Sequence, residues 1–267
     1  MASLSARGLS GLPEVRPGDD LAALILHALG EQTLRDGQIV AIAHKVVSKS
    51  EGALVALADV HASERAHELA AQDGGDAKDP RAIQVVLDQS VEILRAERGV
   101  LICRTHHGLV CANAGVDASN AGPGGIETAA AETLVVLPRD PDASARRVRA
   151  RLRELTRARS GHGAAPAVLI SDSFGRAWRH GQLDVAIGLA GMQPLDDWRG
   201  RTAARGRELR ATWLAVAVAA AAAAELARAK DSQEPVVIVD GLERYVTDED
   251  GPGAAELLRA LDEDMFR

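Results

Sequence analysis

The segment Ala167-Val-Leu-Ile-Ser-Asp172-Ser173-Phe-Gly-Arg176-Ala-Trp-Arg179 decides how this chain is interpreted. Its first four residues are apolar and predict a buried strand that ends in a polar turn at residues 171–173. Turns that follow buried strands hold the ligands in many α/β proteins, and carboxylate and hydroxyl oxygens are preferred by Mg²⁺ and Mn²⁺. Asp172 and Ser173 are therefore candidate metal ligands, although a helix cap explains this turn alone equally well.

Two arginines follow this turn closely. Arg176 and Arg179 can each place a planar guanidinium fork on phosphate or carboxylate oxygens. Trp178 lies between them as an apolar wall or a stacking face. We interpret both arginines as candidate clamps for an acidic substrate or a transferring phosphate, with solvated surface arginines as the alternative.

A second polar segment has the same character: Asn113-Ala-Gly-Val-Asp117-Ala-Ser-Asn120. It follows a predicted hairpin, whose strands at 99–104 and 109–112 flank a turn at His106-His107-Gly108. Asn and Asp side chains that bond their own backbone explain such a segment without any ligand. The repetition of an acidic turn at Asp117 and Asp172 favours a shared site, which only the fold can assemble. For the histidine pair, a polar turn is a better interpretation than zinc binding.

Helices and strands alternate along the rest of the chain. Because a hairpin interrupts this alternation, we expect an α+β fold with mixed or antiparallel sheets and packed helices, and not a doubly wound sheet. A disordered N-terminus is expected over residues 1–10, a main domain over 11–246, and an acidic C-terminal tail with one helix over 247–267. Apolar periodicity and capping residues predict helices at 19–29, 80–97, 143–159 and 206–230, and strands at 38–43, 134–137 and 235–239.

Composition excludes several classes of protein. The 267 residues are 46% hydrophobic and 26% charged, which is typical of a globular chain. The net charge of −7 argues against nucleic-acid binding, and the apolar run at 214–224 is too short to cross a membrane. Cys103 and Cys111 are expected to be reduced, buried thiols. The N-terminus lacks the order of a signal peptide, so a cytoplasmic location is expected.

Four blocks of sequence carry a family resemblance. They resemble the coenzyme F420:L-glutamate ligase family, in a form without the nitroreductase-like half of the actinobacterial two-domain proteins. The similarity runs roughly from Leu12 to Gly241, and it implies a fold of two lobes and an intertwined homodimer. The blocks are residues 11–20, 44–52, 114–120 and 171–182.

The resemblance also implies roles for particular residues. Two divalent ions, Mg²⁺ or Mn²⁺, would be held by three residues: Asp117, Asp172 and Ser173. The GTP site would be lined by Leu12, Pro13, Glu14, Val15, His44, Lys49 and Asn120. Each has an ordinary alternative: Leu12 and Val15 as core residues, Pro13 as a stiff turn, Lys49 as a solvated charge beside Glu51, and His44 as a polar strand end.

The reaction that the resemblance implies is the addition of L-glutamate to coenzyme F420-0. GTP would phosphorylate the acid, the glutamate amine would form a γ-glutamyl amide, and K⁺ is a further candidate cofactor. No G-x-x-x-x-G-K-[ST] loop is present, so another backbone arrangement would have to hold the nucleotide. Ala203, Val218 and Ala219 stand where the family usually has acids. Two alternatives follow: a metal- and nucleotide-binding relative without ligase activity, or a ligase for a different acid and amine.

Overall fold

The centre of the fold is a mixed five-stranded sheet. The computed structural model describes residues 3–72, 78–118, 133–161, 163–229 and 232–264. The strand order is β1-β12-β2-β8-β9, with β2 and β8 parallel and the other neighbours antiparallel. The strands are β1 (Ser5–Gly8), β2 (Ile39–Ala43), β8 (Ala167–Arg176), β9 (Arg179–Ala190) and β12 (Val236–Asp240).

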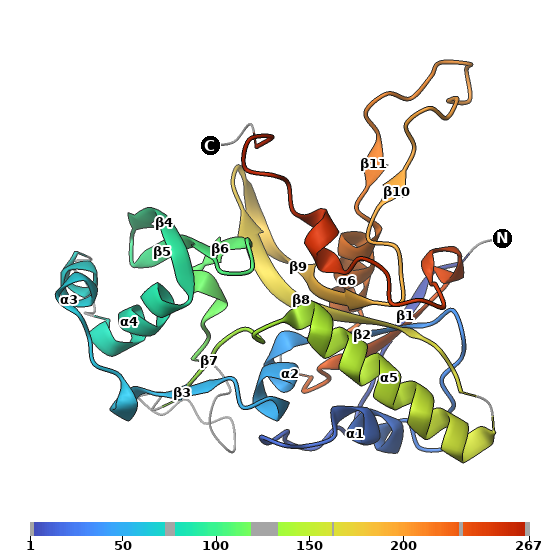
Figure 1. Cartoon of the computed structure of the whole chain (residues 1–267), viewed down its shortest axis with the longest axis horizontal. Helices are drawn as coiled ribbons and strands as arrows, with labels where there is room; N and C mark the ends of the chain where they lie inside the picture. Colours follow the sequence, from blue (N-terminus) through green and yellow to red (C-terminus); the bar gives the residue numbers. More distant parts are fainter. Residues whose placement is uncertain (1–2, 73–77, 119–132, 162, 230–231, 265–267) are drawn as a thin grey trace.

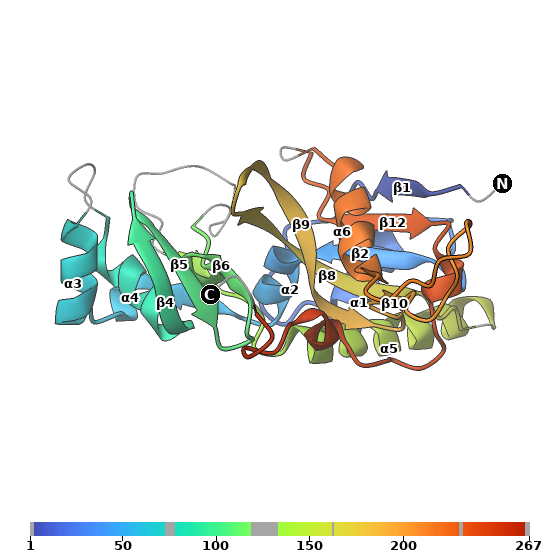
Figure 2. The same cartoon turned by 90° about the horizontal axis from the view of Figure 1, so that it is seen from above.

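Helices cover both faces of this sheet (Figures 1 and 2). Successive side chains of a strand point to opposite faces, so β2 sends Val40 and Ile42 to one face and Ile39 and Ala41 to the other. The first face packs against α1 (Leu21–Ala28) and α5 (Pro141–Ser160). The second face packs against α6 (Val216–Leu226), whose alanines allow a close approach to the sheet.

A smaller lobe lies to one side of the main sheet (Figure 2). Its antiparallel sheet has the order β4-β5-β6 and packs with two short helices. The pair β3 and β7 connects it to α2 and the main lobe. The elements are α2 (His44–Ser50), β3 (Leu54–Ala56), α3 (Glu64–Ala71), α4 (Pro80–Asp88), β4 (Ser90–Glu97), β5 (Val100–Thr105), β6 (Val110–Ala112) and β7 (Thr133–Val135).

Two further features complete the described chain. The short strands β10 (Asp196–Asp197) and β11 (Trp213–Leu214) pair at the base of an arm that projects from the body (Figure 1). The 3-10 helices are η1 (Leu57–Asp59), η2 (Asn113–Gly115), η3 (Glu243–Tyr245) and η4 (Ala254–Leu257). In the part that the structure describes, no helix combines the length and apolarity that a membrane crossing requires.

The mixed α+β architecture with several sheets is as predicted, and so are several elements. The helices expected at 19–29 and 143–159 correspond to α1 and α5, and the hairpin of β5 and β6 forms as expected. The strands predicted at 38–43 and 235–239 are β2 and β12, and the strand predicted at 134–137 is the shorter β7. Cys103 and Cys111 are free and buried.

Five predictions of local structure are wrong. Residues 171–173 do not form a turn, because β8 continues through them and pairs with β9. Residues 90–97 form β4 and not the second half of a helix, because they pair with β5. The helix predicted at 206–230 begins only at Val216, because the preceding residues fold back in the arm, where Trp198 N–H donates to the Thr212 carbonyl at 3.0 Å.

The other two corrections concern the chain ends. Disorder was expected over residues 1–10, but Ser5–Gly8 forms β1 and pairs with β12 at the edge of the main sheet. The tail expected to contain a helix has only the 3-10 turn η4 among residues 247–264. Gly253, with φ of 89°, immediately precedes η4 and lies close to the Asp142 carboxylate, where any Cβ would collide.

Candidate active site at the junction of the lobes

The parallel pair β2 and β8 brings two of the predicted site residues together. Their register places Ala43 beside Ser171, so the residues that follow, His44 and Asp172, lie at the same edge of the sheet. The His44 Nε2 atom is 3.4 Å from Asp172 Oδ1. The site therefore forms where the parallel pairing of β2 and β8 ends, and Asp172 lies within β8, which continues to Arg176, and not in the predicted turn.

Asp117 reaches the same junction from the other lobe. Its backbone pairs with Val135 through hydrogen bonds of 3.0 and 2.9 Å, after a turn in which Asn113, Ala114 and Gly115 all have positive φ. The Asp117 carboxylate is 2.7 Å from Lys45 Nζ, and Lys45 is the second residue of α2. The two acidic segments predicted to converge thus lie on either side of residues 44 and 45.

Asp184 is a third acid at this junction, and the sequence interpretation missed it. It lies directly opposite Ser173 across β8 and β9. Its carboxylate accepts hydrogen bonds from Ser173 Oγ at 2.6 Å and Ser171 Oγ at 2.8 Å, and forms an ion pair with Arg228 at 2.5 Å. Its backbone N–H donates to Glu225 of α6 at 2.8 Å. The sequence did contain a signal for this residue, because Asp184 is the single acid in the otherwise apolar run that follows Gln182.

Burial and crowded negative charge shift the titration of this site. Burial raises the pKa of Asp172 to about 7, and the carboxylates of Asp184 and Asp117 add to the rise. Burial lowers the pKa of His44 to about 4, with a further contribution from the Lys45 ammonium. The contact between His44 and Asp172 therefore joins two groups whose charged forms are both disfavoured.

These residues offer hard oxygen donors suited to Mg²⁺ or Mn²⁺. Burial is the main cause of the raised pKa of Asp172, and repulsion from nearby carboxylates adds to it; a divalent cation would counteract that repulsion. Among the described residues, however, no three His, Cys, Asp or Glu side chains are close enough together to form a complete metal site. The donor set fits a hard cation as part of a coordination shell, with the remaining ligands supplied by substrate oxygens, water or other residues.

The residues predicted to line a nucleotide site differ in their environments. Lys49 is buried and lies 2.6 Å from Glu14, so its expected alternative as a solvated charge beside Glu51 is wrong. Val15 is buried in the main core and Leu12 packs against it, as their ordinary alternative predicts for the side chains. Pro13 is exposed. Asn120 lies outside the described residues.

Arg176 and Arg179 lie at the end of the β8–β9 hairpin, not beside Asp172. They face each other across the hairpin, and Trp178 between them is 85% exposed. Arg176 Nη1 donates to the Val110 carbonyl of β6 at 3.5 Å, while Arg179 Nη1 donates to the Gly181 carbonyl at 2.6 Å. The hairpin end is therefore a positively charged edge of the junction that faces the smaller lobe.

Two buried thiols lie on the smaller lobe, and one of them, Cys111, is close enough to Asp172 to be affected by its charge. Cys103 and Cys111 lie opposite each other on β5 and β6. Burial raises the pKa of Cys111 to about 12, and the carboxylate of Asp172 adds to this effect. A thiol with so high a pKa is a poor nucleophile at neutral pH, so the chemistry of the site belongs to its oxygen and nitrogen groups.

Acids and lysines that meet at an edge between two lobes define a site for an anionic substrate. Comparisons with known proteins identify the class of protein to which the chain belongs. The model of the F420-0:Gamma-glutamyl ligase family matches residues 11–241. A relative from Methanopyrus kandleri, named coenzyme F420:L-glutamate ligase, is 43% identical over 256 residues, which cover 95% of this chain and 94% of that protein.

Two other relatives carry the same name. The protein from Methanothermobacter thermautotrophicus is 40% identical and covers 99% of both chains, and that from Halobacterium salinarum is 39% identical and covers 99% of this chain and 96% of its own. The chain is an enzyme of the ligase class that forms peptide-type bonds. It belongs to the F420-0:Gamma-glutamyl ligase family.

Proposed function

We propose that this protein adds L-glutamate to coenzyme F420-0 in a GTP-dependent reaction that forms a γ-glutamyl amide. The names of its relatives and of its family support the two substrates. The observation that carries the proposal is the meeting of Asp117, Asp172 and Lys45 at one junction. Carboxylates beside a lysine suit the handling of a phosphorylated substrate, because they can hold its counter-ions while the ammonium contacts its oxygens.

The chemistry requires activation of a carboxylate. A carboxylate is a poor acyl donor because its leaving group would be oxide, so the terminal phosphoryl group of GTP is first transferred to the acid. The oxygen of the acid attacks the terminal phosphorus, the bond to the bridging oxygen breaks, and GDP leaves. The amine of L-glutamate then attacks the acyl carbon of the mixed anhydride, loses a proton, and displaces inorganic phosphate.

The described residues divide this work between them. Asp117 and Asp172 would hold one divalent ion and Ser173 would help to hold a second; when bound, these ions neutralise charge that develops on the phosphates. Ser173 Oγ donates its hydrogen bond to the Asp184 carboxylate, which leaves the lone pairs of Ser173 Oγ for a ligand. Lys45, 28% exposed at its side chain, can contact a phosphate oxygen directly.

The nucleotide and the acidic substrate are assigned to different edges of the junction. The buried Lys49–Glu14 pair fixes residues 12–15 against α2, and this supports a GTP site built from backbone groups of Leu12, Pro13 and Val15, with His44 and Asn120 nearby. Arg176 and Arg179 at the hairpin end are proposed clamps for the acidic substrate. We also propose a homodimer, in a cytoplasmic setting where GTP is available.

One incubation tests the proposal. The protein is mixed with F420-0, L-glutamate, GTP and Mn²⁺, and the products are analysed by mass spectrometry and by phosphate release. We expect a product heavier by one glutamyl residue, with one phosphate released per amide formed. GTP binding without any glutamyl product would refute the proposal in favour of a nucleotide-binding relative, and product formed only with a different acid or amine would assign a redirected ligase.

A matched pair of variants tests the assignment of the site. Asp117→Asn keeps the size of the side chain and its backbone pairing but removes a ligand charge, so glutamyl transfer should fall at least 100-fold, the loss expected when a metal-ligand interaction worth roughly 3 kcal/mol disappears. Asp59→Asn removes the same charge from an exposed position away from the junction and should leave the rate unchanged. Equal rates for the two variants would remove Asp117 from the site.

A further inference from the structure

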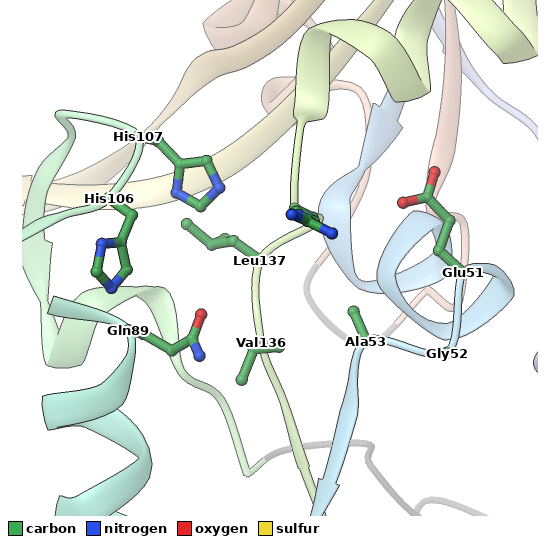
Figure 3. Close-up of a pocket in the computed structure, with 9 residues that line it drawn as sticks. Glu51, Gly52, Ala53, Gln89, His106, His107, Val136 and Leu137 are labelled. Carbon is green, nitrogen blue, oxygen red and sulfur yellow. The ribbon is translucent and has the colours of Figure 1, made fainter.

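A separate groove of about 570 Å³ opens between the two lobes. Figure 3 shows Gln89, His106 and His107 of the smaller lobe on one side, and the segment after α2, residues 51–53, on the other. Val136 and Leu137 form an apolar strip between these sides. The groove thus combines polar walls with a hydrophobic floor.

The two histidines have spare hydrogen-bonding capacity in this groove. His107 Nε2 lies 2.9 Å from the Pro138 carbonyl, and His106 Nε2 lies 3.0 Å from the Asp88 carbonyl. A carbonyl oxygen only accepts, so each Nε2 must carry the hydrogen. The Nδ1 atom of each neutral ring then remains as a hydrogen-bond acceptor. The Nδ1 atom of His107 is buried and has no partner among the described residues.

The charges of the groove favour an anion. Glu51 is its only acidic lining residue among those described, and Arg147 already neutralises it at 2.6 Å. Arg139 also lines the groove, and neither its guanidinium nor the side-chain amide of Gln89 forms a hydrogen bond or ion pair with the described part of the chain. Arg139 and Gln89 are therefore available to donate hydrogen bonds to an anion, and the one acidic lining residue among those described is already paired. The Nδ1 atoms of the neutral imidazoles accept hydrogen bonds, so they suit an N–H group of the same ligand.

The groove is continuous in sequence with the candidate active site. Val135 holds the backbone of Asp117, and the next residue, Val136, lies in the groove and donates its N–H to the Ala53 carbonyl at 3.1 Å. On the other side, Glu51 directly follows α2, which carries Lys45 and Lys49. The groove and the candidate active site are therefore built on the same two segments, the one that begins with α2 and the one that begins with β7.

We propose that this groove binds the α-carboxylates of a γ-glutamyl chain, the part of the acid substrate or product that carries its glutamates. This inference rests on the proposed function. Each γ-linked residue presents one free carboxylate, which the Arg139 fork and the Gln89 amide can bind, and two methylene groups, which can pack on Val136 and Leu137. Inorganic phosphate would engage the same donors but would leave the apolar floor uncovered.

Calorimetric titration tests the groove without turnover. The full-length protein, free of GTP and metal, is titrated with γ-linked triglutamate, α-linked triglutamate and inorganic phosphate. We expect the γ-linked chain to bind most tightly. Arg139→Gln should weaken its binding about tenfold, the effect of losing one charged hydrogen bond in a partly hydrated groove. His107→Gln keeps a donor for the Pro138 carbonyl but removes the Nδ1 acceptor, which can take an amide N–H of the bound chain, and should weaken binding by a smaller factor.

Arg98→Gln is the control, because it removes the same charge from an exposed position at the turn between β4 and β5. It should change the affinity less than twofold. Equal weakening by Arg98→Gln and Arg139→Gln, or phosphate binding as tight as that of the γ-linked chain, would overturn the assignment. Wild-type ligation with unaltered acceptor KM in Arg139→Gln would refute the groove alone, whereas specific chain binding without any glutamyl product would refute only the proposed function.

Discussion

Asp184→Asn is the most direct test of how the junction is held together. The Asp184 carboxylate accepts from Ser173 Oγ, Ser171 Oγ and Arg228 Nη2, and its side chain is 1% exposed. Asparagine has the same shape but only one acceptor oxygen, and its amide nitrogen donates. At least one of the three donors must therefore turn away or face another donor, and the Arg228 guanidinium loses its counter-charge.

The size of the effect follows from these contacts. Separating a buried ion pair costs about 3–5 kcal/mol, because the remaining charge stays buried without a partner. The amide oxygen still offers Arg228 one acceptor, and Arg228 is 14% exposed, so the lower end of this range applies, about 3 kcal/mol. For a chain of this length, each kcal/mol lowers the melting temperature by roughly 2–4 °C, which gives a decrease of about 9 °C.

Urea denaturation followed by circular dichroism measures this loss, and a double-mutant cycle with Arg228→Met isolates the ion pair. Because Arg228→Met removes the charge that Asp184 balances, the coupling free energy should be about 2 kcal/mol. The control is Asp197→Asn, which breaks an exposed pair with Arg199 and should change the stability far less than Asp184→Asn does. A cost for Asp184→Asn no larger than that of the control, or a negligible coupling, would show that the network does not stabilise the fold.

Three other predictions follow from buried polar groups. Arg149→Met removes four hydrogen bonds from a side chain that is 1% exposed, so calorimetry should show a free energy of unfolding lower by about 4 kcal/mol. Arg153→Met is the control, because it removes only one long, exposed contact and should lower the free energy of unfolding by less than about 1 kcal/mol. The Cys111 pKa of about 12 predicts that a thiol reagent at pH 8 labels it only after denaturation, and rapid labelling of the native protein would contradict this. In metal-free protein between pH 4 and 6.5, unfolding takes up a proton at His44 and releases one from Asp172, so the effects of pH on the free energy of unfolding offset each other. In Asp172→Asn only the proton uptake at His44 remains. Urea denaturation of this variant should therefore show a free energy of unfolding that falls by up to about 1.4 kcal/mol for each unit by which the pH falls.

The sequence predicted those parts of the fold where local pattern and tertiary environment agree. Residues 39–43 are apolar throughout and form β2, which is buried on both faces. Asp20, expected near the start of a helix, caps α1 by accepting the Ala23 N–H at 3.1 Å. In such segments the capping groups and the burial favour the same structure, so no distant contact is needed to choose it.

The errors arose where a distant strand decides the local structure. Residues 90–97 support either a helical or an alternating pattern, and pairing with β5 selects the strand. Residues 171–173 are polar enough for a turn, but β9 gives Asp184 as a buried partner for the Ser171 and Ser173 hydroxyls, so the strand continues. The convergence of Asp117 with Asp172 was predicted, but its causes are not readable from either segment alone. The parallel register of β2 and β8 places Asp172 beside α2, and the pairing of Asp117 with Val135 brings Asp117 to Lys45 of the same helix.

The acids expected on the alanine-rich helix bear on whether the site is complete. Val218 and Ala219, which replace them, lie in the first half of α6, and Ala219 is exposed. The polar contact from α6 to the junction is instead made near its C-terminal end, where Glu225 accepts the Asp184 N–H. Residues 218 and 219 are therefore separated from this contact by about two helical turns, at 3.6 residues per turn. The described hydrogen bonds that hold Ser173 involve neither of those two positions. We therefore predict that their replacement leaves metal and nucleotide binding intact.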